Sequence, residues 1–318
     1  MNSHAERCNI FLNILGVQLM INCLYEECAN GITHHFSQFI EQPWRHVIAH
    51  GKFQGKDAVF KLASTLTTSP RTKNEYYWNE AVYLAPSKYR RNFTVPQNFA
   101  SGEYKKLFYF IAQKFLSDPL IKRGSSELSN VSKNIKQIAL ATKEIEVLPI
   151  PQTSNFAISQ NSKTKRPVGY GLLSSATQWA SQTNLNLDKF LGILDKNKEN
   201  IRTCVGQGDF VARQMYKIDG KIGIIDGEHA GIRGPLYYDV AYFYIRLTSE
   251  NDAFDLGKQY LDEFYKLLSN EDKHTFWEQL KPVLIQRYIG NLWDNKSRSE
   301  VEKMQKLGKD ILEDKIII

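Results

Sequence analysis

The chain has 318 residues, of which 42% are hydrophobic and 24% charged, and its formal net charge is +7 at pH 7. This composition is typical of a folded globular protein and excludes a disordered chain. The length suffices for one large domain or for two lobes that share a cleft. The basic residues form no long run, which argues against nucleic acid as a partner, whereas the positive charge is compatible with an anionic ligand.

The N-terminal segment shows no convincing targeting signal. Residues 10–24 are apolar, but polar residues interrupt them, so the segment matches neither a membrane-spanning helix nor a signal peptide. The four cysteines have neither the spacing of a zinc site nor that of a disulfide framework. We therefore expect residues 1–35 to form a helical N-terminal extension of a cytoplasmic protein that has no membrane partner.

Residues 36–113 predict a β-rich lobe with five strands and one helix. Alternating apolar residues around a glycine predict hairpins, and aromatic residues at helical spacing before a proline predict the helix. In chain order the expected elements are a strand or irregular segment at 36–49, a hairpin at 52–63 that turns at Gly55, a helix at 74–84, and a hairpin at 95–112 that turns at 101–103.

Residues 114–318 predict a second lobe that is mostly helical. The expected elements are helices at 128–142, 172–180 and 187–194, a polar surface loop at 152–167, a strand at 201–205, a hairpin at 214–225, and further helices from 238 onward. The predicted fold class is therefore α+β and bilobal, with a β-rich N-lobe over 36–113 and a helix-rich C-lobe over 114–318.

Two aspartates follow β-type runs in the second lobe. Asp209 comes after a glycine, and Asp226 follows an apolar run 17 residues later. Phosphoryl transfer needs one carboxylate that takes the proton of the acceptor hydroxyl and another that holds magnesium. Either aspartate alone could be an ordinary turn residue, since Asp is favoured at strand ends. The pair predicts Asp209 as a general base, and Asp226 with the amide of Gln214 as a magnesium site.

Two further charged groups have more than one interpretation. Lys61 lies inside an apolar strand, where a lysine needs a partner. It is predicted to hold phosphate and to be fixed by a glutamate of the following helix, with Glu80 preferred and Glu75 as the alternative, unless it is an edge-strand lysine that points to solvent. Glu228 could contact the metal, bind the acceptor or face solvent.

Three segments resemble the aminoglycoside phosphotransferase and choline kinase superfamily, which has a protein-kinase-like fold. The family patterns are His-Gly-Asp-(four residues)-Asn, Ile-Asp-x-Glu and Gly-Pro-x-x-x-Asp-x-Ala. They correspond here to Gln207-Gly208-Asp209 with Gln214, to Ile225-Asp226-Gly227-Glu228, and to Gly234-Pro235-Leu236-Tyr237-Tyr238-Asp239-Val240-Ala241. The resemblance spans roughly residue 36 to the C-terminus and is strongest over 203–247.

The resemblance implies an ATP-dependent phosphotransferase that uses Mg²⁺ and takes a hydroxyl of a small molecule as acceptor. It implies that Asp239 braces the catalytic loop through backbone hydrogen bonds and that Gln207 supports the same loop. It also implies that 110–115 forms the last strand and the hinge, with Ala112 and Lys114 in contact with the nucleotide. The acceptor would be chosen by the helical part at 238–293, and the positive net charge argues against a polycationic acceptor.

Departures from the family pattern leave a second interpretation open. Gln207 stands where the family has His, Gln214 stands where it has Asn, and 41–45 contains no glycine. A catalytically impaired pseudokinase or a nucleotide-binding module of the same fold is therefore the alternative. A protein kinase is disfavoured, because the short segment between Asp226 and Gly234 leaves little room for an activation loop and a peptide platform.

Overall fold

The computed structural model describes residues 35–42, 45–122, 125–150, 166–294 and 298–316. The predicted helical extension at 1–35 and the predicted loop at 152–167 lie outside these residues, apart from their last positions. No helix within the described ranges is both long and apolar enough to cross a membrane.

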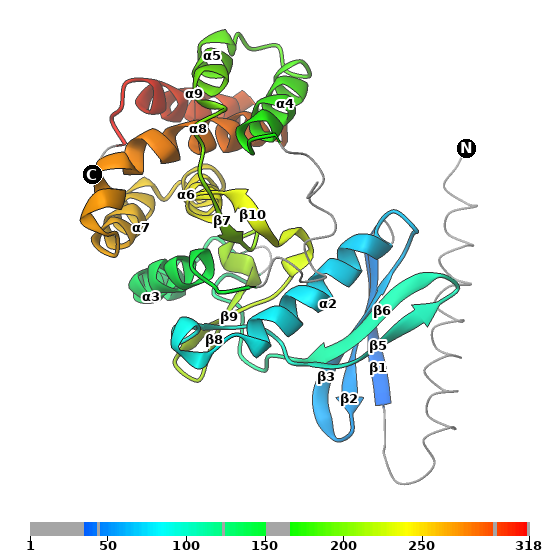
Figure 1. Cartoon of the computed structure of the whole chain (residues 1–318). Coiled ribbons are helices and arrows are strands. Elements are labelled where there is room, and N and C mark those ends of the chain that lie inside the picture. Colours follow the sequence, from blue (N-terminus) through cyan, green and yellow to red (C-terminus); the bar gives the residue numbers. More distant parts are fainter. Residues whose placement is uncertain (1–34, 43–44, 123–124, 151–165, 295–297, 317–318) are drawn as a thin grey trace, which may run out of the picture.

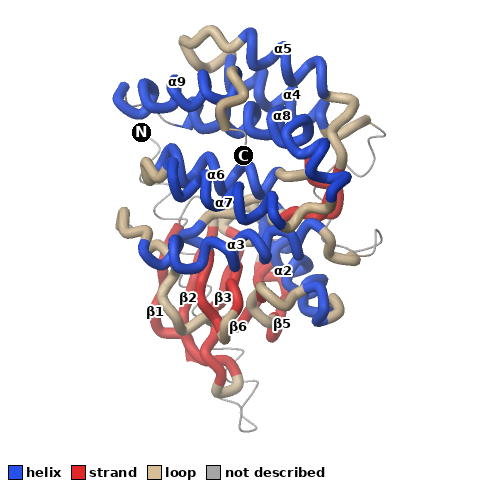
Figure 2. Tube along the Cα trace, turned by 90° about the vertical axis from the view of Figure 1, so that its left-hand side faces the viewer, coloured by secondary structure: helices blue, strands red, loops and turns tan. Residues whose placement is uncertain are grey.

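Within the described residues, the N-terminal lobe is a five-stranded antiparallel sheet in the order β1-β2-β3-β6-β5 (Figure 2). Its strands are β1 His35–Gln42, β2 His46–Phe53, β3 Lys56–Ala63, β5 Asn98–Tyr104 and β6 Leu107–Gln113. Helix α2, Ser69–Leu84, lies between this sheet and the helical lobe (Figure 1). Buried side chains such as Val47, Phe60 and Ile111 form a small core within the sheet.

The two hairpins of the sheet turn at residues with positive φ. Gln54 and Gly55, at φ 50° and 76°, connect β2 to β3, as the sequence predicts. The second hairpin turns instead at Lys105 and Lys106, at φ 49° and 67°, so the prediction of a turn at 101–103 is wrong. Gly102 lies within β5 opposite Tyr109, and a Cβ there would come within 2.7 Å of the Tyr109 hydroxyl. That glycine makes room for a cross-strand ring and does not form a turn.

The second lobe is built from helices around two small sheets, which have the strand orders β4-β9-β8 and β10-β7 among the described residues. The strands are β4 Phe93–Thr94, β7 Thr203–Gly206, β8 Met215–Ile218, β9 Lys221–Ile224 and β10 Gly231–Pro235. The helices are α3 Ser129–Glu146, α4 Gly169–Ala180, α5 Asp188–Asn197, α6 Tyr238–Glu250, α7 Phe254–Lys266, α8 Asn270–Asp294 and α9 Arg298–Leu312. The α+β, bilobal fold class predicted from the sequence is confirmed.

Helix α2 connects the two lobes through its buried face. Trp78 and Val82, each 1% exposed, belong to the large core of the helical lobe although the helix follows the N-terminal sheet. The same helix packs on the short turn Gly227–His229, which comes directly after Asp226. The end of β9 is therefore held against α2, where it can face groups from the sheet.

Candidate active site

The loop after β7 positions Asp209. The carboxylate of Asp239, in the first turn of α6, accepts the backbone N–H of Gln207 at 2.6 Å and that of Gly208 at 2.8 Å. Gly208 has φ 83°, and a Cβ there would meet the carbonyl oxygen of His229 at 2.4 Å. Only glycine fits this close approach, and the chain beyond it presents Asp209 to the space between the lobes. These are the hydrogen bonds that the resemblance implies for Asp239.

The side chain of Gln207 links this loop to the segment around Asp226. It is fully buried, and its Oε1 accepts the backbone N–H of Asp209 at 2.8 Å. Its Nε2 donates to the carbonyl oxygen of Asp226 at 3.0 Å. An amide has both a donor and an acceptor, so Gln207 can brace the two loops where the family has an imidazole.

Lys61 brings the sheet to the second aspartate. Its Nζ donates to Glu75 Oε2 at 2.5 Å and to Asp226 Oδ1 at 2.8 Å. Lys61 is 8% exposed and lies on β3 between two neighbouring strands, which excludes an edge-strand lysine that points to solvent. Burial alone would lower the pKa of Lys61, but the charges of Asp226 and Glu75 outweigh it and hold the pKa above its usual value.

The carboxylates around Lys61 have unequal pKa values. Burial raises the pKa of Glu75 to about 7 despite the neighbouring ammonium. Burial also opposes ionisation of Asp226, but the charge of Lys61 prevails and lowers its pKa to about 2. Asp226 therefore stays ionised at neutral pH, as a metal ligand must.

The predicted pairing of Lys61 with Glu80 is wrong, and the alternative, Glu75, is the partner. Glu80 Oε1 accepts a hydrogen bond from Asn98 Nδ2 at 2.8 Å instead. Five positions along a helix turn a side chain by roughly 140° about the axis, so both glutamates cannot face β3. Glu75 is on the face of α2 that lies against the sheet and is 6% exposed.

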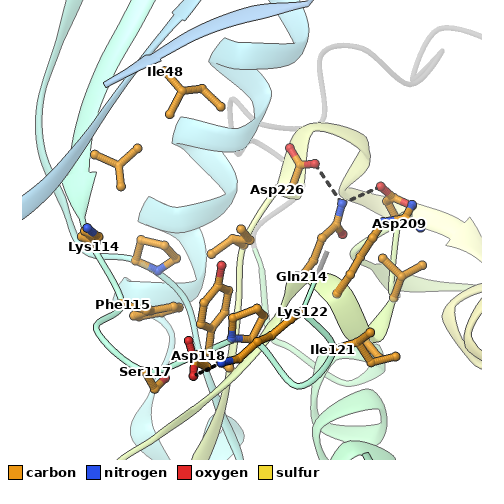
Figure 3. A pocket seen from close by; sticks show the side chains of 18 of the residues that line it. Ile48, Lys114, Phe115, Ser117, Asp118, Ile121, Lys122, Asp209, Gln214 and Asp226 are labelled. Atoms are coloured by element: carbon orange, nitrogen blue, oxygen red, sulfur yellow. Dashed lines mark hydrogen bonds and ion pairs between the residues drawn. The ribbon is translucent and has the colours of Figure 1, made fainter. Parts of the chain in front are cut away.

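The amide of Gln214 joins the two aspartates (Figure 3). Its Nε2 donates to Asp209 Oδ2 at 2.8 Å and to Asp226 Oδ2 at 2.9 Å. Gln214 Oε1 and Asp209 Oδ1 are buried and have no hydrogen-bond partner among the described residues. Two carboxylates thus converge on a single nitrogen, with two unsatisfied oxygens close by.

These oxygens fit a magnesium ion. Mg²⁺ takes oxygen ligands and is usually held by one or two carboxylates together with substrate phosphates and water. Among the described residues, no group of three or more His, Cys, Asp or Glu side chains is arranged to hold a metal ion. A half-turn of the Gln214 amide would exchange its nitrogen for Oε1 and satisfy that oxygen with the cation. The side chains present therefore match a Mg²⁺ ion whose remaining ligands are oxygens of a bound phosphate and water.

A cavity of about 1030 Å³ separates the lobes and contains both aspartates and Lys61. Ile48, Val59 and Ala112 of the sheet give it apolar walls. Lys114 also lines it (Figure 3), but its backbone N–H already donates to the carbonyl oxygen of Asp57 at 3.0 Å. The carbonyl and the side chain of Lys114 are therefore the groups left to contact a bound molecule.

Glu228 does not face solvent, so that interpretation is wrong. It is 2% exposed, and Arg45, directly before β2, lies 2.5 Å from its Oε1. Asn74 of α2 donates to the carbonyl oxygens of Glu228 at 3.2 Å and Ala230 at 2.9 Å. The sequence does not predict the contacts of Arg45 and Asn74, since their partners lie more than 150 positions away and no local pattern marks such pairs.

Known structures share this architecture. Aminoglycoside phosphotransferase APH(4)-Ia, as a thermostable mutant in complex with ADP and hygromycin B, matches with a TM-score of 0.59 and 13% identity over 93% of this chain and 97% of that one. An ethanolamine kinase from Plasmodium vivax matches with a TM-score of 0.57 and 12% identity over 89% and 83%. The GDP complex of aminoglycoside 2'-phosphotransferase-IIIa matches with a TM-score of 0.57 and 12% identity over 94% and 99%.

No protein-family model and no curated protein matches the sequence. At these identities the structural likeness establishes the fold. The chain has the fold of these aminoglycoside phosphotransferases and of the ethanolamine kinase, in agreement with the resemblance of its sequence motifs.

Proposed function

We propose that the protein transfers the γ-phosphate of ATP to a hydroxyl group of a small molecule. Its structural neighbours are small-molecule phosphotransferases, some of them bound to ADP or AMP-PNP. The observation that carries the proposal is the hydrogen bonding of one amide, that of Gln214, to both Asp209 and Asp226. This arrangement provides a base and a metal ligand in one small volume, which is what phosphoryl transfer requires.

The cavity would hold the nucleotide with its base against the sheet. The apolar side chains of Ile48, Val59 and Ala112 suit a flat heterocycle. Lys61, fixed from one side by Glu75, would bind phosphate oxygens with its ammonium group. Asp226 and the amide oxygen of Gln214 would hold Mg²⁺, which when bound neutralises phosphate charge.

Asp209 would accept the proton of the acceptor hydroxyl. Its Oδ1 has no partner among the described residues, and Gln207 and Asp239 fix the backbone on either side of the preceding glycine. A base of this kind needs hydrogen-bond reach to the hydroxyl and does not need an extreme pKa. The hydroxyl oxygen would then attack the γ-phosphorus on the side opposite the departing ADP.

A nucleotide-binding protein without turnover is the second candidate. It is favoured by one detail: Gln214 directs its nitrogen, not its oxygen, at both aspartates. In that case the amide would serve as a permanent substitute for the cation, and the lobes would bind nucleotide without chemistry.

Transfer of labelled γ-phosphate from ATP distinguishes the two candidates. The purified protein is incubated with Mg²⁺, labelled ATP and a mixture of hydroxylated compounds, and the label is followed into product. Transfer that Asp209→Asn abolishes would support the phosphotransferase. MgATP binding without any loss of the γ-phosphate would support the second candidate, and failure to bind MgATP would contradict both.

A further inference from the structure

A cluster of aromatic side chains surrounds one arginine where α4, α6 and α8 meet. The guanidinium carbon of Arg287 lies 4.1 Å from the ring centre of Tyr242, 5.6 Å from that of Tyr238 and 5.7 Å from that of Trp179. Trp179 stacks on Trp293 with 6.0 Å between ring centres. We call these five residues the Arg287 cluster.

The charge of Arg287 has no anionic partner in the described part of the chain. Its side chain is buried, with 7% of the residue exposed, and none of the described carboxylates lies within ion-pair distance of it. Nη1 donates to the Tyr238 hydroxyl at 3.0 Å, whereas Nε is buried without a hydrogen-bond partner. A buried cation is costly unless it is paired, and contact with ring faces returns only part of that cost.

The cluster borders the proposed catalytic base. Tyr242 lies three residues after Asp239, the residue that accepts the N–H groups of the catalytic loop. Burial, together with the nearby charge of Asp209, raises the pKa of Tyr242 to about 12. Arg246 donates to the Tyr242 hydroxyl at 3.1 Å and lines the same cavity as Asp209. Arg246 thus links the cluster to the wall of the cavity that contains Asp209.

Two further arginines lie near the cluster, and both have carboxylate partners. Arg213 lies 3.3 Å from Glu250, while Arg246 lies 2.5 Å from Glu250 and 3.4 Å from Asp294. Arg213 and Arg246 are therefore balanced by the carboxylates of Glu250 and Asp294. Among the described residues of this region, Arg287 is the guanidinium that no carboxylate neutralises, so its charge favours a bound anion over a bound cation.

We propose that the acceptor carries an oxyanion group, such as a carboxylate or a phosphate, which Arg287 binds while the acceptor's hydroxyl lies at Asp209. The inference rests on the proposed function and specifies its substrate class. In the reaction the hydroxyl oxygen forms a bond to the γ-phosphorus, the bond from that phosphorus to the oxygen of ADP breaks, and the hydroxyl proton passes to Asp209. The planar guanidinium suits two oxygens of one anion.

The aromatic residues have a defined part in this arrangement. Tyr238 and Trp179 are partly exposed, so their rings can cover the carbon skeleton of a bound molecule next to Arg287. A cationic acceptor could use the same ring faces only by displacing the guanidinium that already lies over them. The cluster therefore selects against amines as well as for anions.

The test compares phosphate transfer to matched polyols that differ in charge. A panel of hydroxylated compounds contains sets such as D-gluconate and glucose 6-phosphate, neutral D-sorbitol, and cationic D-glucosamine. The wild-type kcat/KM is expected to be about 10- to 100-fold higher for one of the anionic classes than for the neutral compound, as a single buried charge contact allows. The two anionic arms distinguish a carboxylate acceptor from a phosphorylated one.

Arg287→Gln is expected to remove this preference mainly through KM, with MgATP affinity unchanged. Arg287→Lys, which keeps the charge, should retain part of the preference. Arg287→Met, which is also neutral, serves in place of the glutamine variant if that variant does not fold. The control is Arg202→Gln, which changes an arginine that is paired with Asp272 at 2.9 Å, outside the cluster. It should leave the preference intact.

Several results would overturn the inference. These are a wild-type preference for neutral or cationic acceptors, an anionic preference that survives undiminished in the neutral Arg287 variant, or a protein that binds MgATP but transfers phosphate to no anionic compound of the panel. Failure of the wild-type protein to bind MgATP would refute the proposed function itself and with it this extension.

Discussion

The ammonium of Lys61 is shared between two carboxylates, and its position depends on both of them. Glu75 of α2 lies 2.5 Å from its nitrogen, and Asp226, which follows β9, lies 2.8 Å from it. Without Glu75, the ammonium would be drawn toward Asp226 alone and would compete there with a cation. The identity of the helical glutamate therefore matters to nucleotide binding, and the chain offers a matched comparison on the same helix.

Glu75→Gln is expected to weaken MgATP binding about tenfold, equivalent to about 1.4 kcal/mol. The reason is that a neutral amide at position 75 attracts the ammonium of Lys61 less strongly than a carboxylate does, so Asp226 draws the ammonium toward itself. Glu80→Gln is the control, because Glu80 contacts Asn98 and not Lys61. Calorimetric titration with MgATP measures both, and equal losses in the two variants would contradict the assignment.

Asp239 gives the catalytic loop a dependence on pH. Burial raises its pKa to about 6, although the N–H groups of Gln207 and Gly208 oppose this. Protonation as the pH falls through 6 weakens those two hydrogen bonds, so kcat/KM should fall while the fold persists. The folded protein binds this proton more tightly than the unfolded chain does, so the contribution of this group to stability rises as the pH falls from about 6 to about 4.

The check is a pH profile of kcat/KM together with thermal unfolding between pH 5 and 8. We expect the acid limb near pH 6 in the wild-type protein and its loss in Asp239→Asn, whose lower activity should vary little over this range. An identical acid limb in the variant would assign that titration to another group.

At the scale of elements, α2 and the turn after Asp226 behave as one unit. Asn74 hydrogen-bonds two carbonyl groups of that segment, and the Trp78 ring covers Gly227. A Cβ on residue 227 would lie 2.1 Å from Trp78 Cδ1, and Trp78 is itself 1% exposed and cannot easily move. The glycine therefore permits the close packing that fixes Asp226.

Gly227→Ala should destabilise the protein by about 1–3 kcal/mol, as overpacking a core does, and should weaken MgATP binding as well. The matched control is Gly192→Ala on α5, where a Cβ would meet nothing within 4 Å. That change should raise stability by up to about 1 kcal/mol through helix propensity. Calorimetric unfolding of both variants tests the packing, and a neutral Gly227→Ala would show that α2 and the turn are not tightly coupled.

The sequence predicts which helices and strands form more accurately than where they begin and which face they turn toward their neighbours. Helix α2 begins at Ser69, earlier than the predicted start at 74, and the phase at which it meets the sheet decides between Glu75 and Glu80. The spacing of residues along the chain does not show which face of the helix is turned toward the sheet. Gly102 likewise looks like a turn residue, and only the ring of Tyr109 across the strand pair explains it.

At the scale of the whole molecule, the bilobal fold can be predicted because its motifs lie close together in sequence. The segments around Asp209, Asp226 and Asp239 are local patterns, and the structure brings them together through the hydrogen bonds of Gln207 and Asp239. Contacts between distant segments, such as those of the Arg287 cluster, leave no such pattern, because three separate helices contribute to them.

The predicted lobe boundaries at 36–113 and 114–318 remain a proposal. Strand β4, Phe93–Thr94, pairs in parallel with β9 of the second lobe, and Trp78 is buried in the core of that lobe. These contacts cross the predicted boundary. They also mean that α2, which lines the cavity with Glu75 and Asn79, packs on the turn that follows Asp226.

The most direct measurement of the central claim compares two variants for both MgATP binding and phosphate transfer. If Asp209 is the base and Asp226 the metal ligand, Asp209→Asn should bind MgATP within about threefold of wild type yet lose about 10²- to 10⁴-fold in turnover. Asp226→Ala should lose the part of ATP affinity that depends on Mg²⁺. Unchanged turnover in the first variant, or unchanged Mg²⁺-dependent affinity in the second, would contradict the account.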